Sequence, residues 1–195
     1  MFYNMVVAHS YYKLYKPYGY LSQFINNQGQ RRNKKLLGSL WDFPDGTMAV
    51  GRLDEKSEGL LLLTTDGKFS HLITSKGIEK EYHVMVDGVI DENSIQQLQH
   101  GVEISIDGNP YFTKRCKARL LHDISHIEKR FVRDDKHGPT SWLSITLTEG
   151  RFRQVRKMTA QIGFPTLRLV RVRIGDFRLD ELKPGEAKTF RPLNY

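Results

Sequence analysis

Short segments in which apolar and polar residues alternate recur along the chain and predict β-strands. They lie at residues 82–86, 102–106, 142–148 and 170–174. A period of two places successive side chains on opposite faces, as in a strand with one buried face. Asp-Gly pairs stand between the apolar runs, for example at Asp87-Gly88 and Asp107-Gly108, and they favour hairpin turns. We therefore expect antiparallel strand pairing.

Other segments carry helix signals. Asp91 can cap a helix that continues to Gln99, and a short helix is expected after Gly67. Another is expected over residues 33–42, where Pro44 would end it. The last spans residues 153–162, whose apolar side has helical spacing: Val155, Met158, Thr159 and Ile162. Together with the strands, these helices indicate an α+β fold with a mixed, mainly antiparallel sheet flanked by helices.

Length and composition fit one domain over residues 1–195, built as one lobe or as two lobes that share a sheet. The chain is 39% hydrophobic and 11% aromatic, enough for a core of ordinary size. The single cysteine, Cys116, excludes an internal disulfide framework and suits a reducing compartment. Neither an apolar run of 18 residues nor a secretory signal is present. We expect a cytoplasmic protein that has no membrane contact.

Positive charge is unevenly distributed and points to a polyanionic partner. The formal net charge is +8, and residues 151–173 contain seven cations and no acidic residue. These cations are Arg151, Arg153, Arg156, Lys157, Arg168, Arg171 and Arg173. Either they gather to bind an RNA backbone, with the N-terminus of the predicted helix beside them, or each meets a carboxylate elsewhere in the fold.

Two further charged segments have the same two interpretations. Residues 30–35 contain Arg31, Arg32, Lys34 and Lys35. Residues 125–139 form a polar, charged stretch that we expect to be a long hairpin loop. A solvated surface is the usual role of such runs, and contact with RNA is the functional alternative.

A dense polar loop precedes an apolar strand at residues 51–67, which begin Gly51-Arg52-Leu53-Asp54. Loops at the edge of a sheet often carry functional side chains. The residues alone leave Asp54 open as a helix cap, a surface ion-pair partner or a functional carboxylate. They also do not separate it from Glu55 or Glu58.

Three ordered motifs resemble those of the RsuA-type ribosomal RNA pseudouridine synthase family. They are residues 51–67, residues 79–84 and residues 147–158. The segments at residues 16–20, 139–143 and 163–169 look most similar to the RluE branch of the family, which acts on large-subunit rRNA. The resemblance extends from about Tyr12 to Phe190. It implies a pseudouridine synthase catalytic domain that isomerises a specific uridine of 23S rRNA.

The resemblance also assigns roles. Asp54 is the expected catalytic aspartate, Arg52 the arginine that helps to displace the target base, and Tyr82 the ring that stacks on uracil. Arg156 is expected to pair with Asp54, and Val155 to form part of an apolar pocket wall. We expect RNA-backbone contacts from the remaining cations of this region: Arg151, Arg153, Lys157, Arg168 and Arg171.

The chemistry gives reasons for these residue types. Isomerisation breaks the N1 glycosidic bond, turns the base and forms a bond from C5 to the same sugar carbon, with no redox change, so no cofactor is expected. Burial alone favours a protonated aspartate, and a paired arginine opposes this. A base that leaves its stack can recover free energy by stacking on an aromatic ring. The sequence does not show whether Asp54 attacks the base or the sugar, or promotes loss of a 2′ proton.

Some expectations concern what is missing. Many relatives carry an N-terminal S4 module, and this chain is expected to lack one and to act as a monomer without an obligate protein partner. His122 and His126 have helical metal-ligand spacing, but we expect no metal because no third ligand with suitable spacing is evident. Motifs for serine hydrolysis and nucleotide hydrolysis are also missing. The main alternative is a non-catalytic rRNA-binding protein with the same fold.

Overall fold

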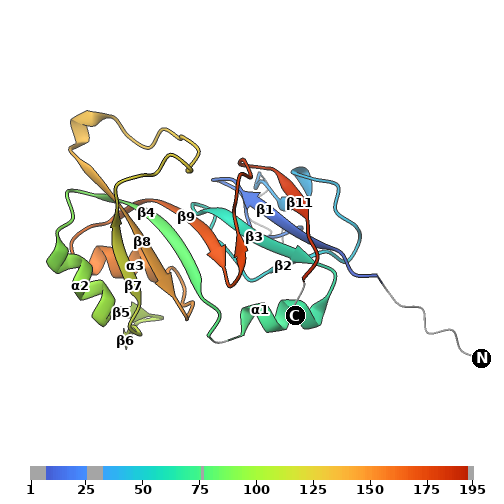
Figure 1. The fold of residues 1–195 in the computed structure, drawn as a ribbon, viewed down its shortest axis with the longest axis horizontal. Coiled ribbons are helices and arrows are strands. Elements are labelled where there is room, and N and C mark those ends of the chain that lie inside the picture. The colour runs from blue at the N-terminus through green and yellow to red at the C-terminus, as the bar shows by residue number, and fades with distance from the viewer. Residues whose placement is uncertain (1–7, 26–32, 76, 193–195) are drawn as a thin grey trace, which may run out of the picture.

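The computed structural model describes residues 8–25, 33–75 and 77–192, and eleven strands and three α-helices lie within these ranges (Figure 1). The strands are β1 (Tyr11–Lys16), β2 (Met48–Val50), β3 (Glu58–Thr64), β4 (Lys80–Asp87), β5 (Glu103–Ile106), β6 (Asn109–Phe112), β7 (Lys117–Leu121), β8 (Thr140–Leu147), β9 (Thr166–Ile174), β10 (Phe177–Arg178) and β11 (Ala187–Thr189). The helices are α1 (Gly67–Thr74), α2 (Glu92–His100) and α3 (Gln154–Gln161).

One large sheet runs through the molecule in the order β11-β1-β3-β9-β4-β8-β7, with β2 beside β3 and β10 beside β9. The strands β5 and β6 form a separate hairpin. Among the described residues, the pair β3 and β9 is parallel, and the other strand pairs are antiparallel. The predicted mixed, mainly antiparallel sheet with flanking helices is therefore confirmed.

The core follows from the alternation along β4 and β8. One face of β4 presents Tyr82, Val84 and Val86 to a buried cluster that also contains Ile95 from α2 and Met158 from α3. Residues two apart in a strand share a face, so one apolar row of β4 can meet both helices. These helices lie beside β4 and β8 in Figure 1, whereas α1 lies along β2 and β3.

A close backbone approach joins the two halves of the sheet. Gly59 in β3 has φ +101° and pairs with Arg171 in β9. A Cβ atom at residue 59 would lie only 2.3 Å from the Arg171 carbonyl oxygen. Only glycine fits this position, because both its φ angle and the space around it exclude a side chain. The polar loop that precedes β3 is thus held against β9.

The expected helix over residues 33–42 is wrong, and the structure has only a 3₁₀ turn there, at Leu37–Ser39. The backbone groups of this segment bond to an earlier one: the Leu21 N–H donates to the Lys35 carbonyl, and the Leu37 N–H donates to the Gln23 carbonyl. Backbone groups used between segments are not available for a helix.

The other helices appear where predicted. Asp91 caps α2 by accepting from the Ser94 N–H, and Gly163, with φ +88°, follows α3. The hairpin prediction holds at Asp107-Gly108, which joins β5 to β6. The hairpin prediction is wrong at Asp87-Gly88, which leads from β4 toward α2. The Asp87 carboxylate pairs with Arg133, and the Gly88 N–H donates to the Pro139 carbonyl.

The segment 122–139 joins the antiparallel neighbours β7 and β8, as expected of a long hairpin loop. It is not simply solvated. Ile127 is buried in a core cluster, the Arg133 guanidinium lies 2.6 Å from the Asp87 carboxylate, and Arg130 donates to Glu58. Apolar burial and ion pairs therefore hold part of the loop to the body of the protein.

Glu58, the first residue of β3, is the buried anion of this network. Its side chain is 2% exposed and accepts two bonds from Arg168, at 2.8 and 3.1 Å. Arg130 adds a third, at 3.2 Å. A carboxylate taken out of water at this depth requires such partners.

Loss of Glu58 should therefore cost more stability than loss of a surface carboxylate. We expect Glu58→Ala to lower the free energy of unfolding by about 3–5 kcal/mol, because Arg168 remains buried without its counter-charge. Asp180→Asn is the matched control, since Asp180 pairs with Lys13 at a half-exposed site and should cost less than about 1 kcal/mol. Urea denaturation measures both values, and equal losses would contradict the assignment.

Candidate active site

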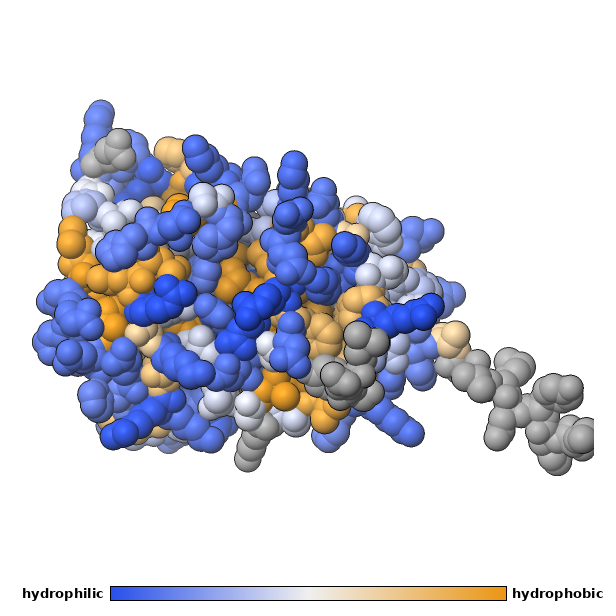
Figure 2. Space-filling model, in the orientation of Figure 1, coloured by the Kyte–Doolittle hydropathy of each residue, from blue (hydrophilic) through white to orange (hydrophobic). Residues whose placement is uncertain are grey.

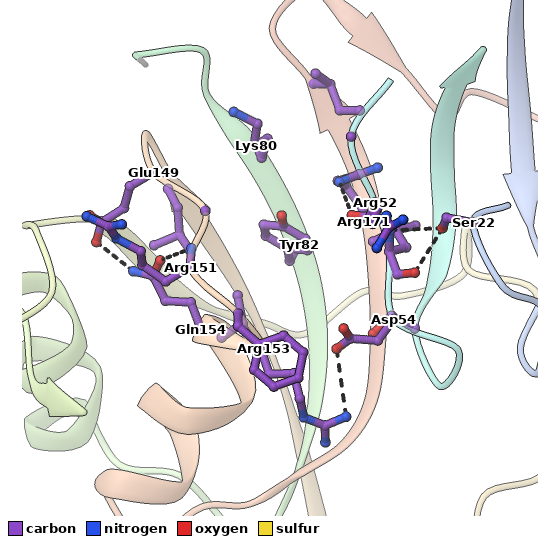
Figure 3. A pocket seen from close by; sticks show the side chains of 18 of the residues that line it. Ser22, Arg52, Asp54, Lys80, Tyr82, Glu149, Arg151, Arg153, Gln154 and Arg171 are labelled. Atoms are coloured by element: carbon purple, nitrogen blue, oxygen red, sulfur yellow. Dashed lines mark hydrogen bonds and ion pairs between the residues drawn. The ribbon is translucent and has the colours of Figure 1, made fainter. Parts of the chain in front are cut away.

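A cavity of about 770 Å³ opens between the loop before β3, strand β4 and the segment that leads into α3 (Figure 3). Its lining combines apolar side chains such as Leu53, Val155 and Leu169 with six cations and three carboxylates, Asp54, Glu55 and Glu149. Figure 2 shows apolar residues exposed between strongly hydrophilic ones on one face of the molecule. The cavity itself has the mixed lining of a site for a partly apolar, negatively charged ligand.

The loop that carries Asp54 is fixed by its backbone. Ser22 Oγ accepts from the Leu53 N–H at 3.0 Å and donates to the Leu53 carbonyl at 2.8 Å. The Leu53 side chain is buried in the core, and the Ser57 N–H donates to the Asp54 carbonyl. With the residues on both sides held, the Asp54 side chain points into the cavity, toward β4 (Figure 3).

Two arginines approach the same carboxylate oxygen of Asp54. Arg156 Nε and Arg153 Nη1 each lie 3.9 Å from Asp54 Oδ2. Arg156 is anchored by further bonds from its Nη2 to the Lys56 carbonyl at 2.8 Å and to Ser57 Oγ at 3.2 Å. Arg156 thus lies within ion-pair distance of Asp54, and Arg153 is a second cation at the same position.

Tyr82 faces Asp54 across the cavity from strand β4 (Figure 3). Its side chain belongs to the same buried cluster as Leu53 and Val155, and all three residues line the cavity. Tyr82 is thus both a core residue and part of the wall. Arg52 is exposed at the cavity, where its carbonyl accepts a bond of 3.4 Å from Arg171.

A network around Glu149 shapes the rim. This carboxylate accepts from the Tyr111 hydroxyl, from the Lys114 N–H at 3.0 Å and from Gln154 Nε2 at 2.6 Å. These bonds and partial burial act in opposite directions, and the net effect is a lowered pKa for Glu149. The Arg151 guanidinium lies 4.9 Å from the centre of the Tyr111 ring. One anion thus ties the hairpin β5–β6 to the start of α3 and sets the position of Arg151.

Comparison with known proteins identifies the family. The sequence model described as RNA pseudouridylate synthase matches residues 10–161. The chain belongs to the RNA pseudouridylate synthase family. It is 44% identical over 176 residues to the ribosomal large subunit pseudouridine synthase E of Xanthomonas axonopodis pv. citri, covering 88% of each chain. The protein of the same name in Xanthomonas campestris pv. campestris is 43% identical, with 92% of this chain and 97% of that protein covered.

A solved structure described as a pseudouridylate synthase agrees with this. It has a TM-score of 0.75 and 30% identity to the chain, and the match covers 94% of this chain and 71% of the other. The resemblance seen in the three sequence motifs, including the one to the large-subunit branch, is confirmed by these relatives.

The structure corrects the prediction for two arginines. Arg168 and Arg171 are 3% and 4% exposed, so neither can lie along an RNA backbone. Arg168 neutralises Glu58, and Arg171 Nε donates to the Leu60 carbonyl at 2.8 Å. Arg171 does line the floor of the cavity. The alternative in which cations meet carboxylates elsewhere in the fold therefore applies to Arg168, and it also applies to Arg173, which pairs with Glu79 and Glu81.

Of the remaining cations, some bind other groups of the protein and some are exposed. Lys157 Nζ donates to the Ser105 carbonyl at 2.7 Å and lies 5.4 Å from the centre of the Phe152 ring. Arg151 is exposed at the rim. In the other charged run, Lys34 pairs with Glu55 at 2.6 Å, and Lys35 lies over the ring of Tyr20. Arg31 and Arg32 lie outside the described residues.

Of the two histidines with metal-ligand spacing, His126 contacts His83 on β4. His126 Nε2 lies 2.9 Å from His83 Nδ1. The described residues contain no group of three side chains that could hold a metal ion. Burial, and then the charge of His126, lower the pKa of His83. Among the residues that the structure describes, no helix is long and apolar enough to cross a membrane.

Sequence reasoning missed Lys16, which lies under the Asp54 loop. It is fully buried, and its Nζ donates to the carbonyls of Pro17, Tyr20 and Glu55 at 2.9, 2.7 and 3.4 Å. Burial lowers the pKa of Lys16 from 10.5 to about 8, against the attraction of nearby Glu58. Ser22 was missed as well, since a lone serine in a polar stretch has no pattern that marks it.

The lowered pKa of Lys16 predicts a pH dependence of stability. Between pH 8 and 10.5 the unfolded chain binds more protons at this lysine than the folded protein does, so the free energy of unfolding rises with pH in that window. Relative to Lys16→Met, the wild type should gain about 2 kcal/mol between pH 8 and 10. Urea denaturation measures both proteins, and the difference between them removes the pH-dependent contributions of groups that they share, such as Cys116. A difference that stays constant with pH would show that the burial of Lys16 does not perturb its protonation.

Proposed function

We propose that this protein isomerises a uridine of large-subunit ribosomal RNA to pseudouridine. The observation that carries the proposal is the placement of the Asp54 carboxylate in a cavity opposite Tyr82, with Arg153 and Arg156 beside it. The choice of RNA is supported by the names of the most similar relatives, which are large-subunit enzymes. An rRNA substrate also favours a cytoplasmic location.

The reaction needs no imported group. The bond between N1 and C1′ breaks, the uracil turns, and C5 bonds to C1′, after which C5 loses its proton and N1 gains one. In the proposed roles, Asp54 is the catalytic carboxylate and the anchored Arg156 keeps it ionised. We propose that the whole chain acts as one catalytic domain, as a monomer.

The base must leave its stack before it reaches Asp54. Unstacking costs a few kcal/mol, and stacking on an aromatic ring returns about 1–3 kcal/mol. Tyr82 offers such a ring, and Val155 and Leu53 complete an apolar wall beside it. Arg52 is exposed at the same cavity, and its proposed role is to occupy the place that the base leaves in the RNA. Arg151 supplies positive charge at the rim, and Lys157 on α3 is proposed to add a further contact to the RNA backbone.

Asp54→Asn tests the activity. Purified wild-type protein should form pseudouridine in unmodified large-subunit rRNA, and Asp54→Asn should form none while still binding the RNA. The exposed Asp180→Asn variant should behave as the wild type, because Asp180 lies outside the cavity. Mapping of pseudouridine in large-subunit and small-subunit rRNA provides the readout.

The outcomes separate the alternatives. A wild-type protein that binds rRNA and forms no pseudouridine would support a non-catalytic rRNA-binding protein instead. Pseudouridine that forms only in small-subunit rRNA would keep the reaction and overturn the proposed substrate.

Arg151 tests the RNA-facing rim. Each phosphate contact contributes about one unit to the slope of log affinity against log salt. Arg151→Ala should weaken RNA binding and flatten that slope by about one. The exposed Lys188→Ala variant on β11 should leave both unchanged. Filter binding at several salt concentrations measures the slopes, and identical slopes for wild type and Arg151→Ala would place the rim outside the RNA interface.

A further inference from the structure

Arg153 has an unusual backbone conformation for its residue type. Its φ and ψ are 52° and 32°, in the left-handed region, and its side chain makes no capping bond to α3. Within the described ranges, the other non-glycine residues with positive φ are Asp107 and Asp180, and aspartate tolerates this region well. A long side chain is strained there, and such strain persists where the surroundings impose it.

The Arg153 side chain uses this conformation to reach Asp54. Its Nη1 lies 3.9 Å from Asp54 Oδ2, and Figure 3 shows the guanidinium beside that carboxylate. The side chain is 40% exposed, and it has no other hydrogen bond or ion pair within the described part of the chain. The pair is longer than a hydrogen bond and open to water, so it is weak.

Arg156 differs from Arg153 in its exposure and in its anchoring. It shares the same oxygen of Asp54, but it is only 12% exposed, and Lys56 and Ser57 fix its guanidinium. Burial, and then the charge of Arg153, lower the pKa of Arg156. Two cations thus crowd one carboxylate oxygen. One is fixed, and the other would relieve this repulsion by leaving.

We propose that Asp54 and a phosphate of the bound RNA compete for Arg153. In the free protein Arg153 covers the Asp54 carboxylate, and in the complex its guanidinium transfers to the phosphate next to the target nucleotide. A phosphate offers two oxygens to the planar guanidinium donors, a better partner than a carboxylate oxygen at 3.9 Å. Binding of RNA thereby uncovers Asp54. The inference rests on the proposed function and extends it to the order of events at the site.

Competition predicts coupling between the two residues in RNA binding. Asp54→Asn removes the partner that holds Arg153, so RNA affinity should rise by about two- to fivefold, the range that corresponds to an exposed ion pair. Arg153→Gly, which keeps the left-handed backbone without strain, should weaken binding. In the Arg153→Gly background, Asp54→Asn should then give no gain in affinity. The wild type and the inactive variants can be compared on one RNA. In this RNA, deoxyuridine or cytidine replaces the target uridine.

The double-mutant cycle distinguishes competition from simple repulsion between Asp54 and RNA. Repulsion alone would give the same gain with and without Arg153, and this additive result would overturn the proposal. As a matched control, Arg178→Ala removes an exposed arginine outside the cavity, and the gain from Asp54→Asn should persist in that background. Arg153→Lys should restore part of the affinity that Arg153→Gly loses.

Thermal unfolding provides a check on folding, because Arg153→Gly should be at least as stable as the wild type if the left-handed backbone is strained. A failure of this inference is separate from a failure of the proposed function. An additive cycle in a wild-type protein that forms pseudouridine contradicts only the transfer of Arg153. Lack of pseudouridine formation by the wild type contradicts the function itself.

Discussion

The burial of Glu58 is the constraint on which the rest of the site depends. This carboxylate stands at the start of β3, four residues after Asp54, and is 2% exposed. A buried anion requires neighbouring positive charge. Arg168 from β9 and Arg130 from the segment 122–139 provide it. The same ion pairs join the strand that follows the Asp54 loop to its parallel neighbour and dock a long connection onto the sheet.

The excess of positive charge consequently has two separate uses. Arg168 and Arg173 neutralise carboxylates inside the protein, and Arg171 bonds to backbone carbonyls. Arg151 remains exposed at the rim of the cavity. The formal charge of +8 therefore overstates how many cations are available to a ligand from the region between Arg151 and Arg173. A similar division applies at Asp54, where Arg156 is anchored by further bonds and Arg153 is partly exposed.

Much of the fold could be predicted because its signals are local. Alternation gave β4 and β8, and Asp91 with its following residues gave α2. The helix expected over residues 33–42 failed because its backbone groups bond to residues 21–23, and pairing between segments leaves no trace in local periodicity.

The site was predictable only in part. The motifs located Asp54, Tyr82 and Arg156, whereas the residues alone did not separate Asp54 from Glu55 or Glu58. Tertiary contacts distinguish these carboxylates: Glu58 is enclosed, and Glu55 and Asp54 both line the cavity. Glu55 pairs with Lys34, whereas Asp54 lies beside Arg153 and Arg156. Lys16 and Ser22 support the loop from distant positions in the chain, and their roles arise only from tertiary contacts.

The close contact at Gly59 has a consequence for how such a protein would choose among uridines. With β3 pressed against the Arg171 backbone, with Leu53 held by Ser22 and with Glu58 enclosed, the floor beneath Asp54 has little freedom to adapt. Deformation must then occur on the side of the nucleic acid. A rigid cavity favours nucleotides that are cheap to extrude, such as those in weak or interrupted pairing, so the mechanical softness of the RNA becomes part of the selection.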